Sequence, residues 1–311
     1  MKKILLLVVS ILLCAGCTFH AVDRTESMEA ADLKILSPSG APALSLLGLA
    51  KDSQENITVV EGTDILQASF VNPNPEYDII LAPTNLGVKL AQAGKTEYRL
   101  ASVITWGNLY IVQNQASSEI AKLAAFGQQA VPGLVFERVK DLIALGELTY
   151  YNAVTEAQAA LLSGNADAAL ISEPAATASI LKAKEAGKVF AVVYDIQLLW
   201  EHQTGSKGFP QAGIFVRETE TNAEAVNQFL SIVEDSMNQY QSYAENNQSH
   251  LIAADIDLAG ADFFGVPNSK IIETCYSKLG LNYRHAKECE KELTDFLSLF
   301  QINYDPSLSI R

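Results

Sequence analysis

The sequence predicts an α/β fold arranged as two lobes, and two observations support this prediction. Apolar runs of strand type alternate along the chain with helix-forming segments, which is typical of parallel strands joined by helices. About 280 residues follow the N-terminal segment, which is more than most single hydrophobic cores contain. The chain therefore has enough material for two cores rather than one.

The first elements follow the order strand, turn, helix. A short strand is expected at 33–37 and a helix at 43–50, joined by a turn from Pro38 to Pro42. Gly40 allows the chain to turn tightly, and Pro42 suits the first turn of a helix because its missing N–H has no partner there anyway. The same order recurs with a strand at 77–81, a turn at 82–85 and a helix that ends at Gly94.

The later elements continue this alternation. Two β-rich runs, 99–105 and 108–113, are separated by Trp106-Gly107. Thr155 is expected to be a helix N-cap, with Gln158 three residues later completing a capping box. The remaining predicted elements are an amphipathic run at 136–145, strands at 168–172, 190–194 and 213–217, a helix at 175–186 and a mostly helical segment after Ala223.

The N-terminus reads as an export signal followed by a lipidation site. Lys2 and Lys3 precede the apolar run 4–13, which is too short to cross a bilayer core that needs about 20 apolar residues. Cys17 follows Ala15-Gly16 and resembles the cysteine of a bacterial lipobox, with Cys14 in place of the usual branched apolar residue. We therefore expect a signal peptide at 1–16 and a lipidated Cys17 with a tether at 17–31.

The composition narrows the functional classes. The chain contains 22 Lys and Arg against 36 Asp and Glu, with a formal net charge of −14. This acidic character disfavours nucleic acid or an anionic membrane as a partner surface. The four histidines are scattered, and no catalytic or phosphate-loop motif is found. We expect no metal, no cofactor, and membrane contact through a lipid anchor only.

Two cysteines remain beyond the lipobox, Cys275 and Cys289. In an exported protein they can form a disulfide, and a bridge closing a loop of this length contributes on the order of 3 kcal/mol. Two buried free thiols are the alternative, because sequence spacing does not give the distance between them.

Four segments carry a family resemblance: SGAPA at 39–43, DIILAPT at 78–84, LSGNADAA at 162–169 and EP at 173–174. In this order they resemble the solute-binding lipoproteins of ABC importers. Within that superfamily they are most similar to the branch that takes nitrate, sulfonates, taurine and pyrimidine thiamin precursors. The resemblance covers most of the chain from Leu33 onward.

This resemblance implies the type II periplasmic-binding-protein fold, in which the chain crosses twice between two lobes that close over a ligand. The implied division is lobe 1 at 32–110, lobe 2 at 111–212, and a return to lobe 1 with C-terminal helices at 213–311. It also implies a monomer outside the cytoplasm, with permease and ATPase subunits as partners.

The loops at the carboxyl ends of strands are the expected ligand site. One such loop contains Ser39, Gly40, Ala41 and Pro42, and a second contains Thr84 and Asn85. Their hydroxyls, amide and backbone N–H groups suit a sulfonate, a carboxylate or another small polar head. Ordinary helix capping is the alternative for each loop, since capping favours the same residue types.

Three further residues are candidates for ligand contact. Trp106, followed by Gly107 and Asn108, can stack on a planar ligand, whereas packing in the core or between the lobes is the alternative. Glu173 can accept hydrogen bonds from an amine or amidine, whereas the alternative is a carboxylate at the lobe rim that contacts the transporter or caps the following helix. The donors of the two loops suit an anionic ligand, whereas Glu173 suits a cationic one, so the ligand charge is left open.

Three functional hypotheses follow. The leading one is a non-enzymatic receptor that captures a small polar or planar molecule and delivers it to a permease. The second is an enzyme on the same fold, of the thiamin-pyrimidine or menaquinone-precursor type. The third is an extracytoplasmic sensor module. The export signal counts against a cytosolic biosynthetic enzyme.

Overall fold

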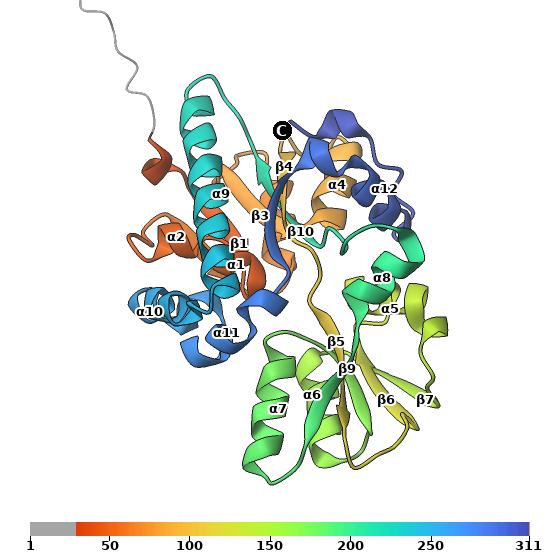
Figure 1. The fold of residues 1–311 in the computed structure, drawn as a ribbon. Helices are drawn as coiled ribbons and strands as arrows, with labels where there is room; N and C mark the ends of the chain where they lie inside the picture. Colours follow the sequence, from red (N-terminus) through yellow and green to blue (C-terminus); the bar gives the residue numbers. More distant parts are fainter. Residues whose placement is uncertain (1–28, 311) are drawn as a thin grey trace, which may run out of the picture.

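The computed structural model describes residues 29–310 and shows two α/β lobes, each built on its own sheet (Figure 1). Lobe 1 contains a six-stranded sheet and lobe 2 a five-stranded sheet. The expected signal peptide, Cys17 and the tether up to residue 28 lie outside the described residues. Among residues 29–310, no helix is long and apolar enough to cross a membrane.

The sheet of lobe 1 has the strand order β11-β4-β10-β3-β1-β2. Strand β1 pairs in parallel with β2 and β3, whereas β10 pairs antiparallel with β3 and β4, and β11 pairs antiparallel with β4. Its strands are β1 (Ile35–Pro38), β2 (Ile57–Val60), β3 (Ile79–Pro83), β4 (Arg99–Thr105), β10 (Ala212–Val216) and β11 (Leu281–His285).

The sheet of lobe 2 has the order β7-β6-β8-β5-β9. Strand β6 pairs in parallel with β7 and β8, and β5 pairs antiparallel with β8 and β9. Its strands are β5 (Leu109–Asn114), β6 (Lys122–Phe126), β7 (Glu147–Tyr151), β8 (Ala168–Ser172) and β9 (Phe190–Asp195). Both sheets are mixed, so the predicted α/β class is confirmed with antiparallel additions to the parallel strands.

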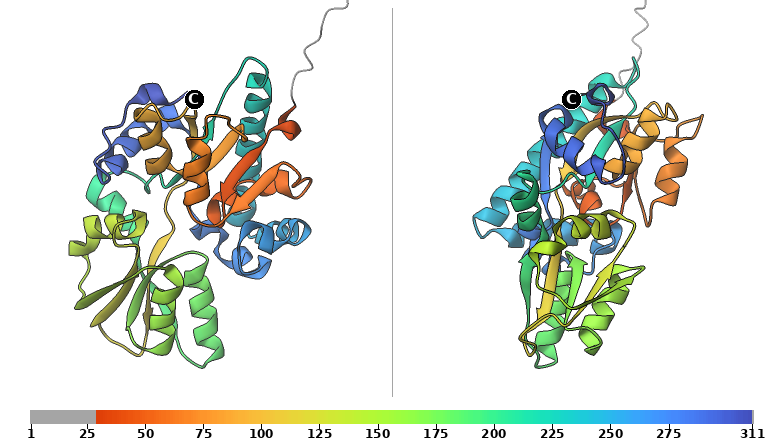
Figure 2. Two further views of the ribbon diagram at one scale, coloured as in Figure 1. Left: turned by 180° about the vertical axis from the view of Figure 1, so that it is seen from behind. Right: turned by 90° about the vertical axis from the view of Figure 1, so that its right-hand side faces the viewer.

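Helices cover both faces of each sheet, as the views from the back and the side also show (Figure 2). In lobe 1 they are α1 (Ala41–Leu44), α2 (Leu47–Ala50), α3 (Asp64–Phe70), α4 (Thr84–Gln92), α9 (Ala223–Glu245), α10 (Ser249–Ala259), α11 (Ser269–Cys275) and α12 (Glu290–Ser298). In lobe 2 they are α5 (Val131–Val139), α6 (Val154–Ser163), α7 (Ala175–Glu185) and α8 (Ile196–Thr204).

Because helices cover both faces of the sheets, a central strand such as β3 is apolar along its whole length. Successive residues of a strand point to opposite faces of the sheet. In β3, Ile79 packs in one hydrophobic cluster with Phe229 of α9, whereas Ile80 packs in another with Val88 of α4. A strand buried on both faces has no polar positions, which explains why its sequence is continuously apolar.

The chain crosses between the lobes twice. The first crossing, residues 106–108, joins β4 to β5, and the return crossing, residues 205–211, joins α8 to β10. The expected boundary after residue 110 therefore lies inside β5, and the one after residue 212 lies inside β10. Gly107 has a φ of 86°, which glycine adopts without strain, and so the two strands separate at this residue.

One hydrophobic cluster is continuous across the two lobes. Trp200 of α8 in lobe 2 packs edge-on against Phe296 of α12 in lobe 1 and against Phe209 of the return crossing, with ring centroids 6.4 and 5.7 Å apart. Phe209 and Phe296 stack with an interplanar angle of 15° and a centroid distance of 5.9 Å. None of the three side chains is more than 1 % exposed, so their burial joins the lobes on this side.

Helix α6 begins differently from the predicted capping box. Its N-cap is Ala153, not Thr155, and Gln158 has no part in capping. Instead, Oε2 of Glu156 accepts hydrogen bonds from the backbone N–H groups of Asn152 and Ala153, at 2.9 and 3.2 Å. A carboxylate in the first turn also suits the partial positive charge of a helix N-terminus, which explains why Glu156 takes this position.

Gly280 provides a test of how closely lobe 1 packs on the first crossing. A Cβ atom at Gly280 would lie 1.9 Å from the backbone oxygen of Gly107, and its φ is 66°. We expect Gly280→Ala to lower the free energy of unfolding in two ways. Strain from the positive φ contributes one part, and displacement of the Gly107 backbone by the added Cβ contributes about 1–3 kcal/mol more. Urea unfolding of the purified protein measures this loss.

Gly62→Ala is the matched control. Gly62 has a φ of 76°, yet an added Cβ would meet nothing within 4 Å. Its replacement should cost only the left-handed strain, about 1–2 kcal/mol. Equal losses for the two variants would show that the crossing adapts freely at Gly280.

Candidate functional site

The loops expected to form the site gather at two facing sheet edges. Strands β1, β3 and β4 run in the same direction and end at one edge of the lobe 1 sheet, from which the first crossing leaves. Strands β6, β7 and β8 end at the edge of lobe 2 where β5 begins. The carboxyl ends of both sets of parallel strands therefore face each other, which is where α/β folds bind ligands.

A cavity of about 510 Å³ lies between the lobes near these edges. Three parts of the chain line it: the β3–α4 turn and its surroundings in lobe 1, the beginning of α5 in lobe 2, and the segment after α12. The polar lining residues are Thr63, Asn85, Lys89, Gln129 and Gln301. The rest of the wall is apolar, formed by Pro83, Leu86, Ala130, Val131, Leu134, Leu299, Phe300 and Ile302.

Asn85 is the one predicted ligand residue that lines this cavity. It is the second residue of α4, and its Oδ1 is buried with no hydrogen-bond partner among the described residues. An amide can present either its oxygen or its NH₂ group to a neighbour. Together with the partial positive charge at the start of α4, Asn85 offers lobe 1 a place to bind a polar or anionic group.

Thr84, the neighbour of Asn85, has its polar groups committed within the protein. Its hydroxyl donates to the backbone oxygen of Pro210 at 2.5 Å, and its N–H donates to that of Gln211 at 3.0 Å. Both partners lie in the return crossing. Thr84 therefore fixes the crossing against the start of α4, and contact between its hydroxyl and a ligand stays a prediction.

The residues Ser39, Gly40, Ala41 and Pro42 form the turn from β1 into α1, as the sequence predicts. The N–H of Ser39 donates to the oxygen of Val60, and the N–H of Gly40 to that of Phe264. Helix α1 has only four residues, so its dipole is weak. The turn lies at the same sheet edge as Asn85, but none of its residues lines the cavity.

Trp106 lies in the first crossing and is 6 % exposed. Its indole N–H donates to the backbone oxygen of Asn282 at 2.8 Å, and the guanidinium of Arg284 lies 4.8 Å from the ring centroid. These contacts match the alternative of packing at the lobe boundary. The indole does not line the cavity, so stacking on a ligand stays a prediction.

Asn108 and Glu173 lie together across the start of lobe 2. The amide nitrogen of Asn108 donates to the backbone oxygen of Glu173 at 3.2 Å, and the N–H of Glu173 donates to that of Asn108 at 2.9 Å. The Oδ1 of Asn108 is buried without a partner among the described residues. The atom is enclosed by protein and Asn108 lies outside the lining of the cavity, so contact between Asn108 and a ligand stays a prediction.

The carboxylate of Glu173 is 3 % exposed and caps α7. It accepts hydrogen bonds from the backbone N–H and the hydroxyl of Thr177, both at 2.9 Å. Burial raises the pKa of the Glu173 carboxyl, while the Thr177 hydrogen bonds and the charge of Lys278 act in the opposite direction. The geometry matches the helix-capping alternative, and Glu173 lies away from the cavity.

Sequence reasoning missed most of the cavity. Lys89 is one turn beyond Asn85 on α4, so the helical period could have placed it on the same side. Gln129 precedes Pro132 in a strand–turn–helix segment of the kind recognised elsewhere in the chain. Phe300 and Gln301 had no such signal, because they follow the last helix of lobe 1 and reach the cavity only through the tertiary fold.

The disulfide alternative for Cys275 and Cys289 is wrong. Both cysteines are free and buried, and they belong to different hydrophobic clusters. The Sγ of Cys289 donates to the backbone oxygen of His285, 3.1 Å away. In the part of the chain that the structure describes, no group of three His, Cys, Asp or Glu side chains is placed to hold a metal ion.

Solved structures share this fold. An ABC transporter protein from Parabacteroides distasonis has a TM-score of 0.67 and 22 % identity, covering 89 % of this chain and 94 % of that one. The periplasmic aliphatic sulphonate binding protein SsuA from Escherichia coli has a TM-score of 0.59 and 18 % identity over 86 % and 91 % of the two chains. The alkanesulfonate-binding protein SsuA from Xanthomonas axonopodis pv. citri, bound to MOPS, has a TM-score of 0.55 and 18 % identity, covering 90 % of this chain and 96 % of that one.

These likenesses define the fold class. The chain has the two-lobe α/β fold of the periplasmic binding proteins, and the predicted fold is confirmed. The structures that share it include ABC transporter and sulfonate-binding proteins, in agreement with the branch that the sequence resembles. No family model matches the sequence. No curated protein matches it either.

The buried Glu173 predicts a distinct pH dependence of stability. A carboxyl whose pKa is raised in the folded state stabilises the protein fully at pH values below its unfolded pKa, about 4.3, and this contribution is lost as the pH rises through the raised value. Glu173→Gln has no such titration. As the pH rises from 4, the wild type should therefore lose free energy of unfolding relative to the Glu173→Gln variant.

Chemical unfolding at several pH values measures this difference. Glu156→Gln is the control, since it removes an exposed capping carboxylate from α6. A Glu173→Gln curve that runs parallel to the wild type at every pH would mean that Glu173 is not buried as a raised-pKa carboxyl.

Proposed function

We propose that this chain is the extracytoplasmic solute-binding component of an ABC importer. It captures a small organic molecule between its lobes and delivers it to a permease without chemical change. The observation that carries the proposal is the cavity of about 510 Å³, because both lobes and the C-terminal segment line it. Cavities of this size with a few polar groups in an apolar wall are typical of small-molecule sites.

The charges around the cavity favour an anionic ligand head. Lys89 is the one ionisable residue in its lining, and the first turns of α4 and α5 carry no acidic side chain. By contrast, Glu156 and Glu173 occupy the starts of α6 and α7 in lobe 2. A helix start without a carboxylate keeps its partial positive charge available to a ligand.

The apolar wall favours a ligand with an apolar body. Leu86, Leu134 and Phe300 are among the residues that cover such a body, while Asn85, Gln129 and Gln301 provide amides for the head. An alkane- or arenesulfonate fits this lining better than a bare nitrate-like ion, which makes no use of the apolar wall. The sulfonate-binding proteins with the same fold support this choice.

The proposal places the protein outside the cytoplasmic membrane as a monomer, anchored by lipid on Cys17. Permease and ATPase subunits are its partners. We expect Cys17→Ser to abolish incorporation of labelled palmitate in cells and to release the protein from the membrane fraction, because lipid is the anchor. Cys14→Ser is the control and should keep the label, and labelled Cys17→Ser protein would contradict the anchor.

Thermal unfolding of the mature, unlipidated chain with candidate ligands tests the binding function. The panel contains alkanesulfonates, arenesulfonates, taurine, nitrate, aminopyrimidines and aromatic carboxylates. A ligand present at 100 times its dissociation constant adds about 2.7 kcal/mol to the stability of the folded protein. We expect the sulfonates with an apolar body to raise the melting temperature, and a folded protein that responds to no class would contradict the proposed ligand range.

Two variants then test the site itself. Lys89→Gln removes the charge of the cavity, and Asn85→Asp places a negative charge at its wall. Each should weaken binding of the active sulfonate roughly tenfold or more. A tenfold change corresponds to about 1.4 kcal/mol, which is the order of the loss expected when a hydrogen bond to a charged group is removed. Lys95→Gln is the control for charge, because Lys95 lies outside the cavity lining. Tighter binding by Asn85→Asp would instead indicate a cationic ligand.

A further inference from the structure

Helix α12 belongs to lobe 1 but contacts the return crossing and a helix of lobe 2, and it bonds Arg284 of β11, which lies over Trp106 of the first crossing. It follows β11, and its apolar face buries Leu293, Phe296 and Leu297 completely. The back view in Figure 2 shows this C-terminal segment directly above the helices of lobe 2 on the side of α5 and α8. A polar and an apolar contact hold it against the return crossing and α8, and a third contact leads to the first crossing through Arg284 of β11.

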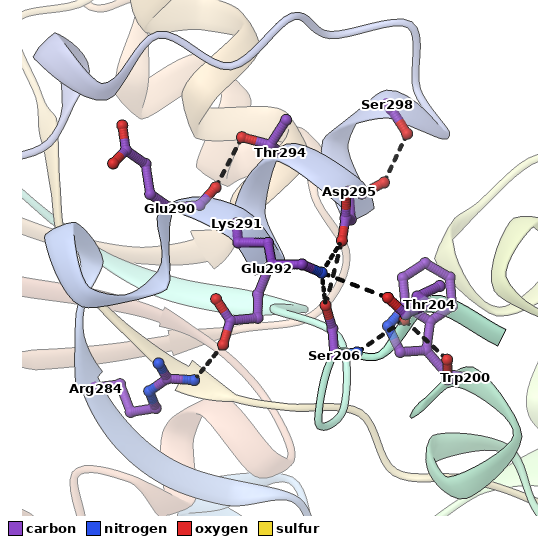
Figure 3. Close-up of polar contacts among 10 residues, drawn as sticks. All are labelled: Trp200, Thr204, Ser206, Arg284, Glu290, Lys291, Glu292, Thr294, Asp295 and Ser298. Atoms are coloured by element: carbon purple, nitrogen blue, oxygen red, sulfur yellow. Dashed lines mark hydrogen bonds and ion pairs between the residues drawn. The ribbon is translucent and has the colours of Figure 1, made fainter. Parts of the chain in front are cut away.

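The first contact is polar and reaches the return crossing (Figure 3). The Nζ of Lys291 lies 2.8 Å from Oδ2 of Asp295 on the same helix, and it donates to the hydroxyl of Ser206 at 3.1 Å and the backbone oxygen of Thr204 at 3.4 Å. The Ser206 hydroxyl in turn donates to Asp295 at 3.3 Å. Ser206 is 4 % exposed, so this group joins α12 to a buried part of the crossing.

The second contact is apolar and reaches α8. Phe296 is enclosed by Trp200 and Phe209, in the stack described above. Ser206 and Phe209 lie in the same crossing, three residues apart. The polar and the aromatic contacts therefore hold α12 against the same short segment of chain, with Trp200 adding the connection to lobe 2.

The third contact reaches the first crossing. Oε1 of Glu292 accepts from Nη1 of Arg284 at 2.8 Å, as Figure 3 also shows, and the Arg284 guanidinium lies over the ring of Trp106. Glu292 and Lys291 are neighbours on the helix. One turn of α12 thus connects to both places where the chain passes between the lobes.

The end of α12 continues into the cavity. The ring of Phe296 packs edge-on against that of Phe300, with centroids 5.3 Å apart. Leu299 to Ile302 form one wall of the cavity, and Gln301 has a φ of 58°. The position of this wall therefore depends on the position of Phe296.

We propose that α12 is a clamp that sets the angle between the lobes in the ligand-free protein and positions the C-terminal wall of the cavity. Phe296, Lys291 and Asp295 are positioning residues in this proposal and do not contact the ligand. The clamp itself does not depend on the proposed importer function. Only the identification of the cavity as the ligand site rests on that function. When the clamp is loosened, the two lobes sample a wider range of separations.

The distance between the lobes, measured by pulsed electron spin resonance without any ligand, tests the clamp. Spin labels are attached through Ala93→Cys at the end of α4 and Ala159→Cys on α6, both exposed sites, one in each lobe. The mature chain from Thr18 is used, which omits Cys14 and Cys17, and its Cys275 and Cys289 are fully buried and should not react with the label. We expect one narrow distance distribution in the otherwise unchanged protein.

Two clamp variants should shift or broaden that distribution. Phe296→Leu removes the aromatic stack but keeps an apolar side chain, and the double variant Lys291→Gln with Asp295→Asn removes both charges but keeps polar side chains at these positions. The double variant changes only groups at the helix surface, so it keeps the test valid if Phe296→Leu does not fold.

Two controls separate a clamp from a merely stabilising helix. Thr294→Ala alters α12 at an exposed residue whose hydroxyl bonds only within the helix, to the backbone oxygen of Glu290 (Figure 3). Phe263→Leu removes a ring of lobe 1 that packs against Phe264. Both controls should keep the narrow distribution. Folded clamp variants whose distance distributions coincide with that of the unchanged protein would overturn the proposal, whatever ligand the cavity binds.

Discussion

The buried contact among Trp200, Phe209 and Phe296 is the constraint on which the rest of the molecule depends. Two α/β lobes joined by short crossings are expected to move relative to each other unless a substantial apolar interface holds them. Here three fully buried rings make the cores of both lobes continuous on one side. The Tyr110 hydroxyl of lobe 2 donates to the backbone oxygen of Lys278 in lobe 1 at 2.9 Å and adds a second connection.

This arrangement decides where a site between the lobes can form. Because the crossings and the aromatic contact bring the two sheet edges together, loops that end separate strands become walls of a common cavity. The helices that begin there are not equivalent electrostatically. Glu156 and Glu173 occupy helix starts in lobe 2, whereas α4 and α5 begin at the cavity without a carboxylate. These helix starts at the cavity keep their partial positive charge free of an acidic cap, which is the basis of the proposal that the ligand is anionic.

Local sequence signals predicted much of the framework. Strands β4 and β8 have the predicted limits, and the break at Trp106-Gly107 is the first crossing. Strands β2, β6, β7 and β11 were missed. Strand β11, with Asn282 and Arg284 among its five residues, lies at the edge of the sheet and does not have the apolar pattern of a central strand. The segment after Ala223 therefore reads as helical although it contains a sheet strand.

The sequence by itself determined the α/β class, the turns that precede helices and the kinds of side chain placed there, because these depend on neighbours within a few residues. The capping of α7 by Glu173 through Thr177 is of this local kind. Only the tertiary structure decided that Thr84 bonds Pro210 while Asn85 faces the cavity. It also decided that the Trp106 indole bonds Asn282, since a polar group's partner is fixed by whichever distant segment the packing brings beside it.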